Sequence, residues 1–156
     1  MYLKKKVLAI IPARKGSKRL VNKNLKDFCG EPLILKTIKA AKESKFIDEV
    51  IVSTDSEEIK NLAIKNNVKA PFLRPKNLSI DTAKTIDVIL HCLDYYEKLK
   101  INFDFCVLLQ PTSPLRTGID IDNALKNIDK NTKAIVSVCE ANHSPIWVNK
   151  LPENLS

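Results

Sequence analysis

Short stretches of apolar residues recur along the chain, at 7–11, 49–54, 104–109 and 133–138. Each has about the length of a β-strand, and its apolar side chains follow one another instead of alternating with polar ones. Continuous apolar runs of this kind are typical of strands that are buried on both faces, as in a parallel sheet. The pattern therefore predicts a strand in each stretch.

Helical periodicity fills the intervals, with apolar residues every three or four positions at 32–45, 55–66, 82–100 and 117–128. Pro32 suits a first helical turn, Asp55 with Glu58 resembles an N-cap and its partner, and Thr117 with Asp120 has capping-box spacing. The alternation of strands and helices predicts an α/β fold, a three-layer α/β/α domain with a mostly parallel central sheet.

Three polar loops follow the first three predicted strands, at 12–26, 53–55 and 110–114. Ligands of open α/β sheets lie outside the carboxyl ends of the strands. We therefore expect these loops to converge at one edge of the sheet and to form the functional site there.

The first of these loops is strongly basic. Nine Lys and Arg residues precede the first acidic residue, Asp27, and the formal net charge of the chain is +8. Gly16 allows a close backbone turn, Arg14 can donate two hydrogen bonds to phosphate oxygens, and Lys23 supplies a point charge. The loop is neither a P-loop nor a dinucleotide fingerprint, because Gly16 is its only glycine. These are the parts of a polyphosphate cradle, and an ordinary basic surface loop is the alternative that composition alone leaves open.

Composition narrows the class of protein. A chain of 156 residues with 44% hydrophobic content favours a single domain. The four cysteines are widely spaced and are expected to be buried, reduced thiols, and without a membrane span or signal peptide we expect a cytoplasmic protein. The positive charge leaves an RNA-binding protein as an alternative. An aromatic content of 6% and the lack of RNA-binding motifs argue against a nucleic-acid partner.

A set of short motifs runs in order through 7–147. They are Pro12-Ala13-Arg14-x-Gly16-Ser17-Lys18-x-Leu20-x-x-Lys23-Asn24, Val52-Ser53-Thr54-Asp55, Arg74-Pro75, Asp81-Thr82 and Leu108-Leu109-Gln110-Pro111-Thr112-Ser113-Pro114-Leu115-Arg116. Together they resemble the acylneuraminate cytidylyltransferases, also called CMP-sialic acid synthetases. The 3-deoxy-manno-octulosonate cytidylyltransferases share the first loop type and are the alternative family.

The resemblance implies a Rossmann-like fold of the nucleotide-diphospho-sugar transferase type. It implies an enzyme that moves CMP from CTP to the anomeric hydroxyl of a nine-carbon 2-keto sugar acid and releases pyrophosphate with Mg²⁺. Such chemistry depends mainly on alignment and on neutralisation of charge. The resemblance also implies a homodimer that serves cell-surface polysaccharide biosynthesis, without choosing among sialic, legionaminic and pseudaminic acids.

Roles follow from the resemblance at matching motif positions. Arg14 and Lys23 would hold the triphosphate and act as catalytic residues, Ser17 would help to cradle it, and Asn24 would contact the nucleotide. Gln110 would face the sugar acid. The positions expected to border the base and ribose are the backbone of Ala13, and Arg74, Ala83 and Thr85.

Family members continue beyond the position of Ser156, and the resemblance places the metal ligands there. We therefore expect 1–156 to form one incomplete cytidylyltransferase domain, and a CTP-binding module without turnover stays an alternative. Asp120 and Asp122 are not expected to bind metal, since they lie in a predicted helix start. Asp81 is interpreted as a helix cap, and His91 and His143 are assigned no function.

Overall fold

The computed structural model describes residues 5–16 and 20–140, and its centre is a parallel three-stranded sheet. The strands are β1 (Val7–Pro12), β2 (Glu49–Ser53) and β3 (Phe105–Leu108), in the spatial order β2-β1-β3. The middle strand, β1, pairs in parallel with a neighbour on each side. The predicted parallel sheet is confirmed.

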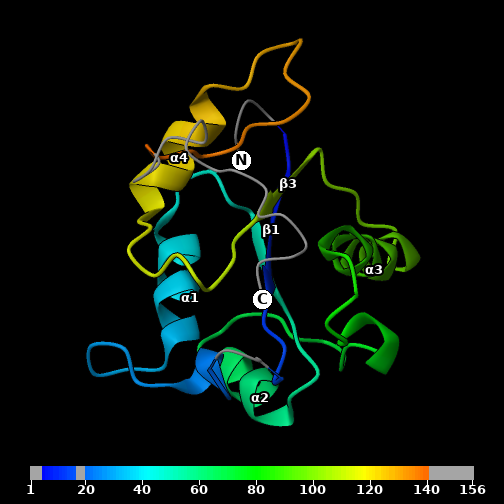
Figure 1. Cartoon of the computed structure of the whole chain (residues 1–156). Helices are drawn as coiled ribbons and strands as arrows, with labels where there is room; N and C mark the ends of the chain where they lie inside the picture. The colour runs from blue at the N-terminus through cyan, green and yellow to red at the C-terminus, as the bar shows by residue number, and fades with distance from the viewer. Residues whose placement is uncertain (1–4, 17–19, 141–156) are drawn as a thin grey trace, which may run out of the picture.

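Within residues 5–16 and 20–140, four α-helices and two short 3₁₀ helices surround the sheet (Figure 1). They are η1 (Lys23–Leu25), α1 (Leu33–Glu43), α2 (Glu57–Lys65), η2 (Lys76–Leu78), α3 (Thr85–Lys98) and α4 (Gly118–Lys126). Helices α1, α2 and α4 pack on the face of β1 that carries Val7, Ala9 and Ile11, and α3 packs on the face that carries Leu8 and Ile10. The three-layer prediction is therefore also confirmed.

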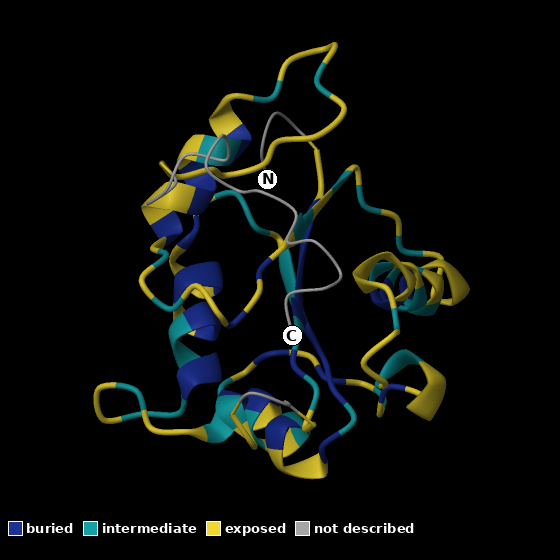
Figure 2. Ribbon diagram, viewed as in Figure 1, coloured by how far each residue is buried: buried dark blue, intermediate teal, exposed yellow. Residues whose placement is uncertain are grey.

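The buried residues follow this layering (Figure 2). On the α3 side, Cys92 and Tyr96 close the smaller core cluster. Burial raises the pKa of the Cys92 thiol to about 11. The other three cysteines are free but exposed, so the prediction of buried thiols is correct only for Cys92. No helix among residues 5–16 and 20–140 is long and apolar enough to cross a membrane.

Helix α4 begins as the sequence predicts. Thr117 accepts a hydrogen bond from the Asp120 amide, and the Asp120 carboxylate accepts one from the Thr117 amide, at 3.3 and 2.8 Å. Helix α2 differs, since its N-cap is Ser56, whose hydroxyl accepts the Ile59 amide. Asp55, the predicted cap, instead accepts a hydrogen bond from the Lys15 amide.

Helix α3 starts later than predicted. Its first residue is Thr85 and its N-cap position is Lys84, so neither Asp81 nor Thr82 caps it. The interpretation of Asp81 as a helix cap is therefore wrong. The local sequence permits a cap at Asp81, but the segment between η2 and α3 places its carboxylate beside a charged partner instead.

The predicted strand at 133–138 does not form. A groove of about 740 Å³ lies between this segment and β3, and Val136 and Val138 are 78% and 90% exposed. A strand requires a neighbour that exchanges backbone hydrogen bonds with it. The prediction of a strand at 133–138 is therefore wrong, because within the described part of the chain β3 lies across the groove and does not pair with this segment.

We expect Gly118→Ala to destabilise the fold by about 1–3 kcal/mol, the usual range for forcing atoms into a packed site. A Cβ at Gly118 would lie 2.8 Å from the Glu43 backbone carbon and the Ser44 amide nitrogen, where α4 meets the end of α1. In an exposed helix the same substitution is stabilising. Urea denaturation measures the difference, with Asn123→Ala on the exposed side of α4 as control. An unchanged free energy of unfolding for Gly118→Ala would contradict this packing.

Candidate functional site

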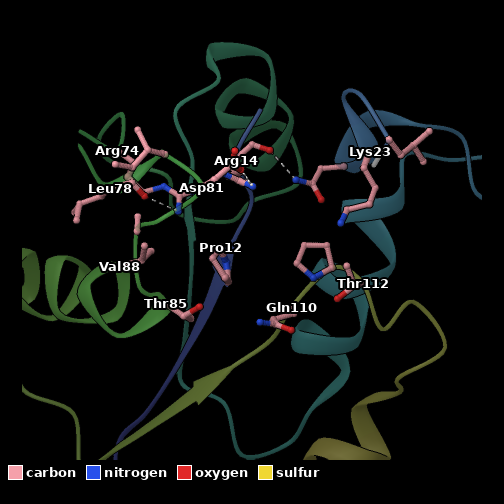
Figure 3. A pocket seen from close by; sticks show the side chains of 15 residues that line it. Pro12, Arg14, Lys23, Arg74, Leu78, Asp81, Thr85, Val88, Gln110 and Thr112 are labelled. Atoms are coloured by element: carbon pink, nitrogen blue, oxygen red, sulfur yellow. Dashed lines mark hydrogen bonds and ion pairs between the residues drawn. The ribbon is translucent and has the colours of Figure 1, made fainter. Parts of the chain in front are cut away.

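A cavity of about 460 Å³ lies beyond the carboxyl ends of β1 and β3 (Figure 3). Its walls come from the end of β1 and the loop after it, from the segment 74–88, and from 110–112 after β3. From β1 the chain passes to β2 on one side of β1, and it then crosses to β3 on the other side. The cavity therefore lies at a topological switch point. The expected convergence of loops is confirmed for the first and third loops, which line the cavity directly.

The loop after β1 is fixed on both sides of Arg14. The Asn24 side-chain amide, buried in η1, donates to the Arg14 carbonyl at 3.0 Å. The Lys15 amide donates to the Asp55 carboxylate at 2.7 Å. The loop at 53–55 therefore does not line the cavity but supports the residues that do. The Ala13 side chain lies in the core and its amide donates to the Ser53 carbonyl at 2.9 Å, so the role expected of its backbone stays a prediction.

Arg74 reaches the cavity along the edge of β2. The segment around Lys69 bonds in parallel to β2, and the Arg74 amide then donates to the Thr54 carbonyl at 2.7 Å. This path carries the side chain inward, where only 6% of the residue is exposed.

The Arg74 guanidinium is largely without hydrogen-bond partners in the described part of the chain. Its Nη1 approaches the Leu78 carbonyl at 3.5 Å, while Nε and Nη2 are buried and unpartnered. Burial lowers the pKa of Arg74, and the nearby Asp55 charge opposes this effect. Because an arginine side chain stays protonated in proteins, this is a buried cation with two parallel donors unused. A ligand with two adjacent acceptors would satisfy them.

The remaining polar groups surround the cavity. Lys23 lies across it from Arg74 (Figure 3), and Thr85 opens α3. Gln110 has an exposed side chain, and its carbonyl accepts from the Ser113 amide and from Arg116 Nη2 at 3.3 and 3.2 Å. These two bonds hold the loop that presents Gln110.

Most of the predicted site residues come together. Those that line the cavity are Arg14, Lys23, Asn24, Arg74, Ala83, Thr85 and Gln110. Ser17 lies outside the described residues, so its role stays a prediction.

Sequence reasoning missed an apolar wall and one carboxylate. Leu78, Ile80 and Val88 line the cavity. Val88 follows Thr85 by three residues on the same helix, and this spacing could have identified it. No comparable spacing in the sequence identifies Leu78 or Ile80. Asp81 also lines the cavity, where its Oδ1 lies 2.5 Å from Nη2 of Arg14.

The described residues of the cavity thus combine three cations, one carboxylate and an apolar wall, which suits an anionic ligand with a flat apolar part. A metal centre is not supplied by these residues alone, since residues 5–16 and 20–140 hold no group of three His, Cys, Asp or Glu side chains that could bind one. Asp120 caps α4, and Asp122 accepts hydrogen bonds from the Ser44 hydroxyl and the Lys45 amide.

Known proteins resemble the chain over most of its length. A CMP-N,N'-diacetyllegionaminic acid synthase of Legionella pneumophila is 38% identical over 94% of this chain and 63% of its own length. A pseudaminic acid cytidylyltransferase of Campylobacter jejuni is 44% identical over 70% of this chain and 47% of its own. An N-acylneuraminate cytidylyltransferase of Escherichia coli is 41% identical over 90% and 33%. The chain therefore spans less than two thirds of the length of these relatives.

A solved structure of CMP:2-keto-3-deoxy-manno-octonic acid synthetase in complex with CTP has the same fold. It aligns with a TM-score of 0.65 at 27% identity, over 78% of this chain and 46% of its own. Residues 8–150 match the family described as Cytidylyltransferase. The ordered motifs, the cavity at the switch point and this match over nearly the whole chain agree, and the chain belongs to the cytidylyltransferase family.

Proposed function

We propose that this protein transfers CMP from CTP to the anomeric hydroxyl of a nonulosonic acid and releases pyrophosphate. Family membership and the names of the three relatives support the reaction class. These relatives are named for three different acids, so the proposal covers the nonulosonic acids as a class. A homodimer and a requirement for Mg²⁺ belong to the proposal on the family resemblance alone.

The observation that carries the proposal is the unpartnered edge of Arg74. Cytosine presents two acceptors side by side, O2 and N3, which match the parallel donors Nε and Nη2. Uracil carries a hydrogen on N3, so one of these donors would face another donor. The neighbouring Leu78 and Val88 offer apolar contact to a flat ring. Arg74 would therefore read the base, in agreement with the role implied by the motif.

Arg14 and Lys23 would bind the triphosphate. In the reaction the anomeric oxygen forms a bond to the α-phosphorus, and the bond from this phosphorus to the oxygen bridging it to the β-phosphorus breaks. Negative charge grows on the departing pyrophosphate. Fixed cations stabilise such charge because they need no reorganisation during the step. The described residues provide no ligand set for Mg²⁺, so no step is assigned to the ion.

We expect this chain to bind CTP at least about a hundredfold more tightly than UTP, since a mismatched buried donor is costly. Calorimetric titration with CTP, UTP, ATP and GTP measures the preference. Arg74→Lys should reduce the ratio of CTP to UTP affinity to near one, because an ammonium lacks the parallel donors. Lys65→Arg, which also exchanges one cation for the other but at an exposed position outside the cavity, is the control. Equal binding of CTP and UTP by the unaltered chain would contradict the proposed base recognition.

We expect Arg14→Ala and Lys23→Ala each to lower turnover by roughly two to three powers of ten, the scale for removing a preorganised charge-stabilising donor. Pyrophosphate release, in a chain extended to the length of the relatives, measures it. Lys15→Ala and Lys26→Ala remove the same charge from exposed positions that do not line the cavity. Near-normal turnover in both cavity variants would exclude the cradle.

The acceptor is tested in the same assay with nonulosonic acids and with 3-deoxy-manno-octulosonate. Pyrophosphate release with a nonulosonic acid supports the proposal, and release with the octulosonate alone would favour the alternative family. CTP binding without release in either case would favour a binding module.

A further inference from the structure

Among the described residues that line the cavity, Asp81 is the only acidic one. Its Oδ1 accepts a hydrogen bond from Nη2 of Arg14 at 2.5 Å, although the two residues are 67 positions apart in sequence. Nη1 of Arg14 also approaches the Ser79 carbonyl, at 3.4 Å. Figure 3 shows Arg14 and Asp81 close together on the same side of the cavity. A carboxylate of the protein itself therefore occupies one end of this guanidinium.

Local structure does not account for the position of Asp81. It lies between η2 and α3, and α3 begins only at Thr85 without a side-chain cap. The segment is joined by few backbone bonds, such as that from the Ala83 amide to the Ile80 carbonyl at 3.2 Å. The carboxylate thus lies on a short segment between η2 and α3, outside both helices.

The pair with Arg14 is also partly exposed. The side chains of Arg14 and Asp81 are 31% and 38% accessible. Ion pairs with this much exposure to water contribute little to stability and are readily exchanged for another partner. By contrast, a phosphate oxygen is a strong acceptor for a guanidinium and brings several charges of the same sign as Asp81.

A triphosphate that approaches Nη2 of Arg14 meets this carboxylate at the same place. An acceptor at hydrogen-bond distance from that side of Nη2 would overlap the present position of the Asp81 oxygen, and the two anions would repel each other. Binding of the phosphate to the N–H of Nη2 that now faces Asp81 therefore requires the carboxylate to leave.

We propose that Asp81 is an internal competitor for the nucleotide, whose carboxylate holds Arg14 in the empty site and is exchanged for a phosphate oxygen when CTP binds. This inference rests on the proposed function. It implies that Asp81 lowers the affinity for every phosphate-bearing ligand of Arg14. Pyrophosphate is among these ligands, so Asp81 also favours departure of this product. Asp81 is then an affinity-determining residue and not a catalytic one.

The test is calorimetric titration of the Asp81→Asn chain with CTP, pyrophosphate and cytidine. We expect CTP and pyrophosphate to bind roughly three- to tenfold more tightly than to the unaltered chain, the scale for a partly exposed ion pair with added repulsion. Cytidine, which lacks phosphate, should bind unchanged. Asp87→Asn removes the same charge from the first turn of α3, away from the cavity, and should leave all three affinities unchanged.

Arg14→Ala separates competition for Arg14 from a general effect of charge. If Asp81 acts through Arg14, adding Asp81→Asn to Arg14→Ala should change CTP affinity less than twofold. Thermal unfolding tests whether each variant is folded. If Asp81→Asn does not fold, Asp81→Ser takes its place.

Unchanged or weaker CTP binding by folded Asp81→Asn would overturn the inference. An equal gain in CTP affinity from Asp81→Asn in the Arg14→Ala background would also overturn it. In either case, CTP binding by the unaltered chain keeps the proposed function intact. If neither the unaltered chain nor Asp81→Asn binds CTP or pyrophosphate, both fail. If Asp81→Asn alone binds them, competition is supported in its strongest form.

Discussion

The complete burial of residues 7–11 of β1 is the constraint on which the other features depend. Residues 7–11 have no exposed surface, and both edges of the strand are paired. Such a strand accepts only apolar side chains and requires helices on both faces. Its neighbours run parallel to it, so the carboxyl ends of all three strands point to the same edge. The first charged side chain after β1 is Arg14, at the point where the chain leaves the core.

This constraint explains why most of the fold can be predicted from the sequence. Continuous apolar runs identify β1, β2 and β3, and the start of α4 is decided by two side chains three residues apart, Thr117 and Asp120. The errors concern contacts between distant residues. The segment 133–138 has a strand's composition but, in the described structure, no strand beside it. The start of α3 depends on where the chain must go after Arg74, which the local sequence does not encode.

The residues of the site likewise divide into those whose position the sequence could predict and those whose position it could not. Arg14, Lys23 and Asn24 lie close together in one loop, so their shared position could be predicted from the motif and from the end of the strand. The burial of Arg74 could not, because it results from the segment 68–74 following the edge of β2. Asp81 was misassigned for a related reason. Its residue type suits a helix cap, and only the fold reveals that Arg14 lies within hydrogen-bond distance.

Under the proposed function, burial would assign the two arginines of the cavity to different ends of the nucleotide. Arg74 is desolvated, and placing a multiply charged phosphate beside it would require that phosphate to lose its water as well. A neutral ring with two acceptors satisfies the same donors without this cost. Arg14 is about one third exposed, so a phosphate bound there can keep part of its hydration. The arginine at position 74 would therefore suit a base and the arginine at position 14 a triphosphate, because the two positions differ in how much water they admit.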